Sequence, residues 1–162
     1  MSDFPPAAFA LEKLAVPYRL FVHTMPINSL EEAAAEREQS PNQVVRSILF
    51  RIAEGNFVMV LIAGPTQISW AKLRAYLGQS RLSMASEAEV LEITGYRVGA
   101  VSPFGLPNPI RILADENVFI QDEVSIGSGQ RGTAIILKSR DLRSTLNYIE
   151  IDRFADKMPG TS

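Results

Sequence analysis

Two apolar runs that lie close together, residues 44–52 and 57–63, constrain the fold more than any other feature of the sequence. The residues between them include Glu54, Gly55 and Asn56, which are typical of tight turns, so the pair predicts a β-hairpin. Consecutive side chains in residues 57–63 are apolar, so a strand here is apolar on both faces. We therefore place this strand in the centre of a sheet.

The rest of the chain alternates between helix and strand signals. Ser29, Ser69, Ser86 and Ser139 each stand where a helix is expected to begin, and Ser40 before Pro41 is a further start signal. We expect helices at residues 7–14, 29–38, 69–77, 86–95 and 139–146, a long ordered loop at 98–109, and further strands at 18–23, 80–84, 110–114, 118–121, 124–126, 133–137 and 148–151.

This mixture predicts an α+β fold, because helices are interspersed with strands and hairpins outnumber βαβ crossovers. We expect one domain over residues 1–156, with a mixed, mostly antiparallel β-sheet flanked by helices. Residues 157–162 are expected to form a frayed C-terminal tail.

Composition excludes several kinds of site. The 162 residues contain no cysteine and one histidine, His23, which excludes thiol nucleophiles and cysteine or three-histidine zinc sites. The net charge of −2 indicates that any contact with nucleic acid comes from a local patch. No apolar run approaches the length of a membrane span, and residues 1–6 lack the pattern of a signal peptide, so we expect a cytoplasmic protein.

Arg46 is the first candidate functional residue. In a strand it shares a face with Val44, Ile48, Phe50 and Ile52, which are all apolar. A guanidinium on such a face is costly unless it is paired or meets water or a ligand. Either Arg46 extends out to solvent at the start of the strand, or it places a cation at the mouth of a pocket, where it suits a phosphate or a carbonyl oxygen.

Two glycine-rich segments are candidate binding loops. Residues 95–107 contain glycine and proline in a pattern that suits either a surface turn or a loop that aims its N–H groups at an anion or carbonyl. Residues 126–132 lack the Gly-Lys-Ser/Thr ending of a P-loop and precede a strand, which leaves a backbone anion site or a plain hairpin loop.

A serine hydrolase is not favoured. Ser102 is followed by Pro103, and its other neighbours do not form a Gly-x-Ser-x-Gly elbow. The only base available would be His23, which suits either a buried hydrogen-bonded role or the lining of a pocket. Two basic clusters are either solvated faces or contacts for an RNA backbone: Lys72, Arg74 and Arg81, and Arg131, Lys138, Arg140 and Arg143.

Three motifs occur in order: residues 43–50, beginning Gln-Val-Val-Arg; residues 94–105, which contain Gly99-Ala100-Val101-Ser102-Pro103; and residues 129–132, Gly-Gln-Arg-Gly. Together they resemble the YbaK/ProX family, which is homologous to the editing domain of bacterial prolyl-tRNA synthetases. The resemblance covers residues 9–156, and its most specific part is the Gly-x-x-x-Pro loop at residues 99–103.

The resemblance implies an α+β fold and a freestanding aminoacyl-tRNA deacylase. Such an enzyme hydrolyses the ester of tRNA charged with a wrong, small amino acid such as Ala, Ser, Thr or Cys, in several cases on tRNA(Pro). The implied partner is aminoacyl-tRNA, with prolyl-tRNA synthetase as a further candidate. We expect no cofactor or metal, no contact with membrane or DNA, and a monomer.

The resemblance also implies roles for particular residues. Catalysis is assigned to Arg46, Gly99, Ala100 and Val101, with the backbone N–H groups of the loop holding the carbonyl oxygen. Substrate binding is assigned to residues beside the pocket and to a second wall: His23, Met25, Ile27, Ser102, Pro103, Gly127, Ser128 and Gly129.

The chain departs from the family pattern in three places. Arg46 stands where the family usually has lysine, and arginine keeps the charge but does not act as a base. Ser128 is displaced by one position in the third motif, and Ala134 replaces an acidic residue found in some members. A changed substrate is the natural inference. The alternative is a catalytically weakened module of the same fold that binds aminoacyl-tRNA or a nucleotide.

Overall fold

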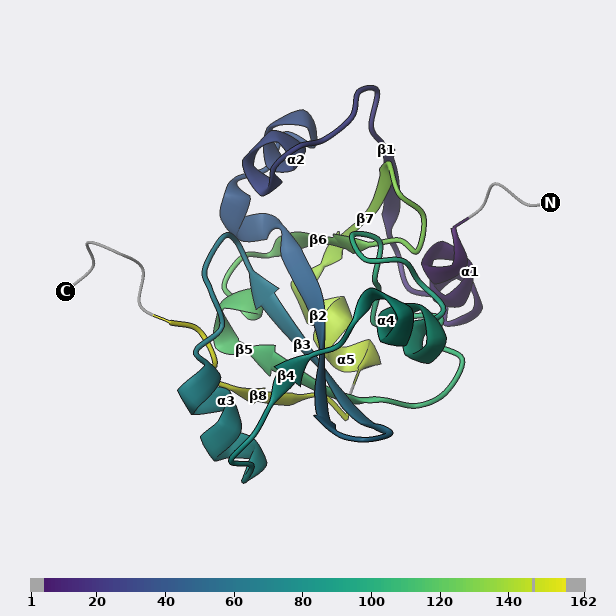
Figure 1. The fold of residues 1–162 in the computed structure, drawn as a ribbon. Helices are drawn as coiled ribbons and strands as arrows, with labels where there is room; N and C mark the ends of the chain where they lie inside the picture. The colour runs from purple at the N-terminus through teal and green to yellow at the C-terminus, as the bar shows by residue number, and fades with distance from the viewer. Residues whose placement is uncertain (1–4, 147, 157–162) are drawn as a thin grey trace.

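A computed structural model describes residues 5–146 and 148–156, and Figure 1 shows its fold. The predicted tail at residues 157–162 lies outside the described residues. The helices are α1 (Pro6–Lys13), α2 (Leu30–Glu36), α3 (Trp70–Leu77), α4 (Glu87–Thr94) and α5 (Ser139–Thr145), with short 3-10 helices η1 (Pro41–Gln43) and η2 (Glu116–Phe119). The strands are β1 (Arg19–Val22), β2 (Val45–Ala53), β3 (Asn56–Ala63), β4 (Ser83–Met84), β5 (Arg111–Asp115), β6 (Glu123–Gly127), β7 (Thr133–Lys138) and β8 (Glu150–Asp152).

The predicted hairpin forms the centre of a five-stranded sheet with the order β4-β2-β3-β5-β8. Strand β3 pairs antiparallel with β2 and parallel with β5. Its side chains enter two cores, because Met59 and Leu61 pack on one face while Val58, Val60 and Ile62 pack on the other. The prediction of a central strand, apolar on both faces, is confirmed.

A second sheet holds the other strands, which the sequence did not separate from the first. Strands β1, β7 and β6 form an antiparallel sheet in that order. It meets the five-stranded sheet where Val44, just before β2, bridges to Ser125 in β6. The main core lies between the sheets, from Val45 and Leu49 on one side to Val124 and Ile135 on the other. The fold class is α+β, as predicted, with two sheets instead of one.

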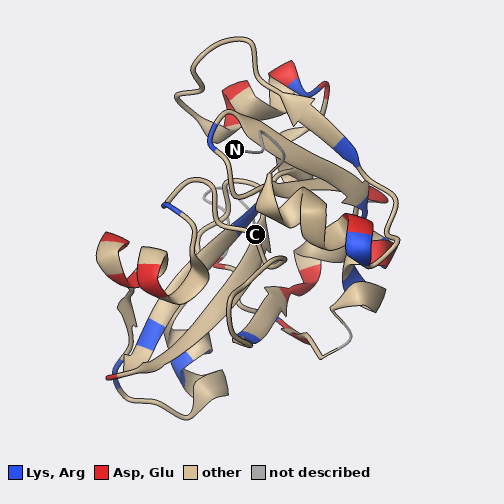
Figure 2. Cartoon of the chain, turned by 90° about the vertical axis from the view of Figure 1, so that its right-hand side faces the viewer, with Lys and Arg blue, Asp and Glu red and all other residues tan. Residues whose placement is uncertain are grey.

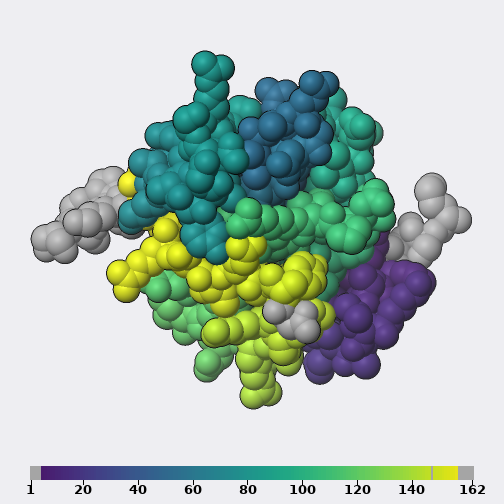
Figure 3. Space-filling view, turned by 90° about the horizontal axis from the view of Figure 1, so that it is seen from below, coloured from purple at the N-terminus to yellow at the C-terminus, as the bar shows by residue number. Residues whose placement is uncertain are grey.

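Helices cover the outer faces of this core. Helix α3 places Leu73 on the second core, with Phe50 and Phe154. Helices α1 and α5 close the main core with Leu11 and Leu142. On the face seen in Figure 3, α1 (purple) lies beside the C-terminal part of the chain (yellow). No helix among residues 5–146 and 148–156 is both long and apolar enough to cross a membrane.

Local helix signals were mostly confirmed, with two corrections. Ser29, Ser69 and Ser86 cap their helices, each accepting a hydrogen bond from a backbone N–H three residues on. Residues 118–121 are not a strand, since the Asp115 side chain caps η2 there by accepting from Asn117 N. Ser139 is not the cap of α5, because its hydroxyl donates to the Gln121 carbonyl oxygen at 2.6 Å.

Candidate functional site

Two adjoining cavities form a cleft where the two sheets meet. The larger has a volume of about 600 Å³ and the smaller about 310 Å³. Both are lined by the same five junction residues: Arg37, Val44, Arg46, Gly99 and Thr133. The larger cavity is completed by residues 25–30, with His23, Ala33, Arg131 and Gly132. The smaller is completed by Val45, Ser47, Ile48, Val98, Val101, Ile126 and Gly127.

The smaller cavity is walled mainly by aliphatic side chains from the two sheets. Val45 and Ile48 come from β2 and Ile126 from β6, while Val101 comes from the loop at residues 99–103. Ser47 adds a hydroxyl that is buried and makes no hydrogen bond within the described residues. This cavity therefore suits a small, mainly apolar group with one polar atom.

Two residues of the loop at residues 99–103, Gly99 and Val101, line the cleft. Gly99 has φ +93°, a left-handed conformation that glycine adopts readily. Ala100 N–H donates to the Arg97 carbonyl oxygen at 3.0 Å. Within the described residues, the Gly99 and Val101 N–H groups donate no hydrogen bond. Gly99 and Val101 can therefore serve a ligand oxygen, whereas the predicted donor Ala100 is already engaged.

Gly127 of β6 fixes the position of this loop. A Cβ at residue 127 would overlap the Val101 carbonyl oxygen and would lie 2.9 Å from its carbon and 3.1 Å from the Ala100 carbonyl oxygen. The loop is held further by Gly129 N–H, which donates to the Ala100 carbonyl oxygen at 2.9 Å. Close backbone packing on Gly127 therefore determines where the loop donors lie.

Arg46 borders both cavities, and its side chain is partly exposed. Its Nε donates to the Gly64 carbonyl oxygen at 3.0 Å, and its Nη2 donates to the Thr66 carbonyl oxygen. Burial lowers the pKa of the Arg46 guanidinium. Of the two sequence interpretations, this geometry favours the cation at a pocket, although two of its donors are occupied by backbone carbonyls.

Four of the predicted substrate-binding residues line the cleft beside the junction, as does Val101 from the predicted catalytic residues. His23, Met25 and Ile27 lie along the larger cavity, and Gly127 along the smaller one. Substrate contact by these four residues stays a prediction that their positions support.

Five other predicted residues do not line either cavity: Ala100, Ser102, Pro103, Ser128 and Gly129. The buried Ser102 hydroxyl accepts from Phe104 N–H, and the Ser128 hydroxyl donates to the Gln130 carbonyl oxygen. Gly129 packs against the Tyr96 ring. Pro103 lines a separate, mainly apolar cavity of about 620 Å³ with residues 104–111. These positions support the loops and do not favour direct contact with substrate.

Arg37 is the main residue of the cleft that the sequence analysis missed. Its Nε donates to His23 Nε2 at 3.1 Å and its Nη1 donates to Ser125 Oγ at 2.9 Å. Burial lowers the pKa of Arg37 to about 10. Arg37 caps the C-terminal end of α2, four residues after Ala33 and three after Ala34. This spacing could have placed Arg37 on the same helix face as the two alanines, but it does not say what that face packs against.

The arginines of the cleft carry positive charge that no carboxylate neutralises directly. Within the described residues, Arg37, Arg46 and Arg131 have no carboxylate oxygen within 4.0 Å, and Arg131 instead donates to the Val98 carbonyl oxygen. Elsewhere acidic and basic residues are interspersed (Figure 2). The cleft therefore offers cations and free N–H groups, which suits an anionic ligand that also carries a carbonyl.

Comparison with known proteins assigns the chain to a family. The sequence model described as the aminoacyl-tRNA editing domain matches residues 24–145, which include every junction residue. The chain belongs to the aminoacyl-tRNA editing domain family. Its editing-domain sequence therefore confirms the predicted resemblance, and all residues that line the cleft except His23 lie within the matched range.

Curated relatives of this editing domain are larger proteins. The proline–tRNA ligase of Kosmotoga olearia is 38% identical over 97 residues, which cover 60% of this chain and 16% of the ligase. That of Streptococcus pneumoniae is 31% identical over 130 residues, which cover 80% of this chain and 21% of the ligase. The chain thus spans about a fifth or less of these relatives.

A solved structure shares the fold of the editing domain over nearly the whole chain. A crystal structure described as a proposed trans-editing enzyme for prolyl tRNA synthetase superposes with a TM-score of 0.86. The match covers 96% of this chain and 100% of that chain at 22% sequence identity. The two proteins therefore have the same fold.

Proposed function

We propose that the protein hydrolyses the ester between a wrong, small amino acid and the 3′-terminal adenosine of a tRNA. The observation that carries this proposal is the junction of the two cavities. There Arg46 and Arg37 line the same cavities as Gly99, and within the described part of the chain the N–H groups of Gly99 and Val101 donate no hydrogen bond. The family, aminoacyl-tRNA editing domains, supports the proposal. The arginines at the junction suit a substrate that carries many negative charges.

The two cavities suit the two halves of such a substrate. Pockets of roughly 300–1,000 Å³ are typical of small-ligand sites, and both cavities fall in or near that range. The larger, bordered by the exposed Met25, takes the terminal adenosine. The smaller, walled by aliphatic side chains, takes the amino acid. The ester then lies at the junction residues.

Hydrolysis at the junction needs an oxyanion site and a nucleophile. A water molecule, oriented by the adjacent ribose hydroxyl of the substrate, attacks the carbonyl carbon and gives up a proton. The C–O bond to the ribose then breaks, and the ribose oxygen takes up a proton. The developing oxyanion accepts from Gly99 and Val101 N–H, each donor contributing roughly 2.7–4 kcal/mol in comparable sites. Arg46 adds positive charge. Because an aminoacyl ester is already activated, we propose that the reaction is metal-independent.

Selection against larger amino acids comes from the size of the smaller cavity. One methylene changes binding by only about 1–3 kcal/mol, so steric exclusion by Val45, Val101 and Ile126 has to contribute. Alanine, serine, threonine and cysteine are the proposed substrates. The ligase relatives suggest tRNA(Pro) and prolyl-tRNA synthetase as partners. We further propose that the protein is a monomer and acts in the cytoplasm.

A binding module is the second candidate, favoured by one observation. Two donors of Arg46 are engaged by backbone carbonyls, so this residue has less freedom to follow a transition state. Such a module binds an aminoacyl or nucleotide ligand without turnover. Measurement of turnover separates the two candidates.

The test is a deacylation time course on tRNAs charged with Ala, Ser, Thr, Cys and Pro. We expect hydrolysis of one or two small amino acids, and a fall of about 10²-fold or more in Arg46→Ala because a charge at the reacting centre is lost. Arg46→Lys keeps the charge and should retain part of the rate. Arg51→Ala, on the same strand but exposed and paired with Glu89, is the matched control. Full turnover in a folded Arg46→Ala protein would remove Arg46 from the mechanism, and binding without hydrolysis would favour the module.

A further inference from the structure

Arg37 is fixed by side chains from two other parts of the chain. It follows α2, while His23 follows β1 and Ser125 lies in β6. The neighbouring Glu36 does not pair with it, since that carboxylate accepts from Thr24 N at 2.7 Å and lies 3.3 Å from His23 Nδ1. Both acceptors of Arg37 are therefore neutral groups, and its positive charge is retained.

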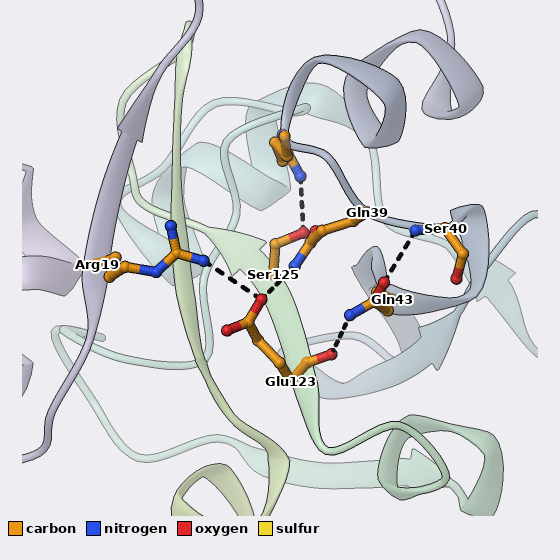
Figure 4. Close-up of polar contacts among 7 residues, drawn as sticks. Arg19, Gln39, Ser40, Gln43, Glu123 and Ser125 are labelled. Atoms are coloured by element: carbon orange, nitrogen blue, oxygen red, sulfur yellow. Dashed lines mark hydrogen bonds and ion pairs between the residues drawn. The ribbon is translucent and has the colours of Figure 1, made fainter.

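The segment after α2 is anchored to β6, which holds Arg37 against the cleft. Figure 4 shows Gln39, Gln43 and Ser125 gathered along β6, with Glu123 at its start. Gln43 Nε2 donates to the Glu123 carbonyl oxygen at 3.0 Å, and Gln39 Nε2 lies 3.5 Å from the Glu123 carboxylate. The chain segment that carries Arg37 is thus held on β6, and the guanidinium is held by Ser125 and His23.

His23 orients Arg37 through a hydrogen bond. Its side chain is only 4% exposed, and its Nε2 accepts from Arg37 Nε, which requires an unprotonated Nε2. Its Nδ1 faces Glu36 Oε2 at ion-pair distance, without the alignment of a hydrogen bond. Glu36 therefore contacts His23, and His23 contacts Arg37, which lines the cleft.

One donor group of Arg37 remains for a ligand. Within the described residues its Nη2 makes no hydrogen bond, and the side chain borders both cavities. Glu36 attracts Arg37 electrostatically but is engaged by Thr24 and His23, and both direct partners of the guanidinium are neutral, so this half-buried cation gains from an anion that a ligand supplies. In an aminoacyl ester the carboxylate of the amino acid is consumed. The anion that every such substrate brings is the phosphodiester on the 5′ side of the terminal adenosine.

We propose that Arg37 is a substrate-binding residue that contacts this phosphodiester, and that His23 is the positioning residue that orients it. This inference rests on the proposed function for the identity of the substrate. In this proposal His23 orients Arg37 instead of contacting the substrate. The residue that binds the phosphodiester, Arg37, lies outside the three sequence motifs.

The test compares ligands with and without the phosphate. The probes are adenosine and adenosine 5′-methylphosphate, whose single charge matches a phosphodiester, with binding followed by NMR titration. We expect the natural protein to bind the phosphate-bearing ligand about tenfold more tightly, and Arg37→Met to lose that preference while still binding adenosine. Arg37→Lys should recover part of it. Arg153→Met, which removes an exposed arginine paired with Glu116, should keep it in full.

The positioning role is tested with His23. His23→Gln retains an acceptor for Arg37 and should keep most of the preference for the phosphate, whereas His23→Leu should lose much of it. Equal affinity of the natural protein for both ligands, or an unchanged preference in a folded Arg37→Met protein, would overturn the proposal.

Aminoacylated forms of the same two ligands separate this proposal from the proposed function. If ester hydrolysis is present and Arg37→Met slows both aminoacylated ligands equally, Arg37 has a structural role only and this proposal fails. If the phosphate preference depends on Arg37 but no ester is hydrolysed, this proposal holds and the proposed deacylase function fails.

Discussion

Gly127→Ala is expected to reduce deacylation by about 10²-fold or more while leaving the fold intact. The new Cβ would overlap the Val101 carbonyl oxygen, so the loop at residues 99–103 has to move away from β6. A displacement of about 1 Å at a reacting group is enough for a loss of this size. Gly127 does not have a left-handed φ, so the effect comes from the loop and not from backbone strain at residue 127.

The measurement is the initial rate of ester loss at saturating aminoacyl-tRNA, with circular dichroism as the check on folding. Gly55→Ala is the control, because Gly55 lies in the β2–β3 turn with no atom near a new Cβ. Its positive φ makes that substitution strained as well, so the control accounts for a general loss of stability. A rate for Gly127→Ala close to that of Gly55→Ala would show that the loop position does not matter to the reaction.

Asp115→Ala is expected to have the largest effect on stability, with a loss of about 3–5 kcal/mol in the free energy of unfolding. Asp115 is 3% exposed. One carboxylate oxygen accepts from Phe154 N at 2.7 Å and Ala155 N at 2.8 Å, and the other accepts from Asn117 N at 2.9 Å. Alanine would leave these backbone donors without their partner.

Urea denaturation followed by fluorescence measures this loss. Asp115→Asn retains one acceptor oxygen but presents an amide donor to Asn117 N–H, so an intermediate loss is expected. Asp122→Ala, at an exposed position in the turn before β6, should change the free energy by no more than about 0.5 kcal/mol. A loss below about 1 kcal/mol in Asp115→Ala would contradict the role given to this carboxylate.

The Asp115 cluster also supports the cleft. Asn117 exchanges hydrogen bonds with the backbone of Ala63 through its side-chain amide, at 3.0 and 3.2 Å. Ala63 precedes Gly64, whose carbonyl oxygen accepts from Arg46. Loosening Asp115 is therefore expected to disturb Arg46 as well as the C-terminal residues.

Local signals in the sequence predicted most of the fold. The hairpin of β2 and β3 and the serine caps depend on residues within a few positions of one another, so a single sequence contains the information. The division into two sheets depends on pairing between β1 and β7, which lie far apart in the chain. The unbroken apolar run at residues 134–137 does not say which strand will pair with it.

Arg46 and Gly99 are the two predicted site residues that line both cavities, and their roles stay predictions. Ser102, Ser128 and Gly129 stabilise the loops, because the two hydroxyls and the Gly129 N–H form hydrogen bonds with the backbone of these loops. Arg37 was missed because its place in the cleft depends on how α2 packs against β6. A motif identifies the loop, but tertiary packing decides which of its atoms face the ligand.

The most direct test of where the ester binds is to map the amide N–H signals that respond to a non-hydrolysable substrate analogue. With a 3′-aminoacylamido-adenosine, we expect large shifts at Gly99 and Val101, and a small one at Ala100, whose N–H donates to the Arg97 carbonyl oxygen. Shifts confined to Gly105, Leu106 and Asn108, which line the separate cavity, would contradict the placement of the reaction at the junction of the two cavities.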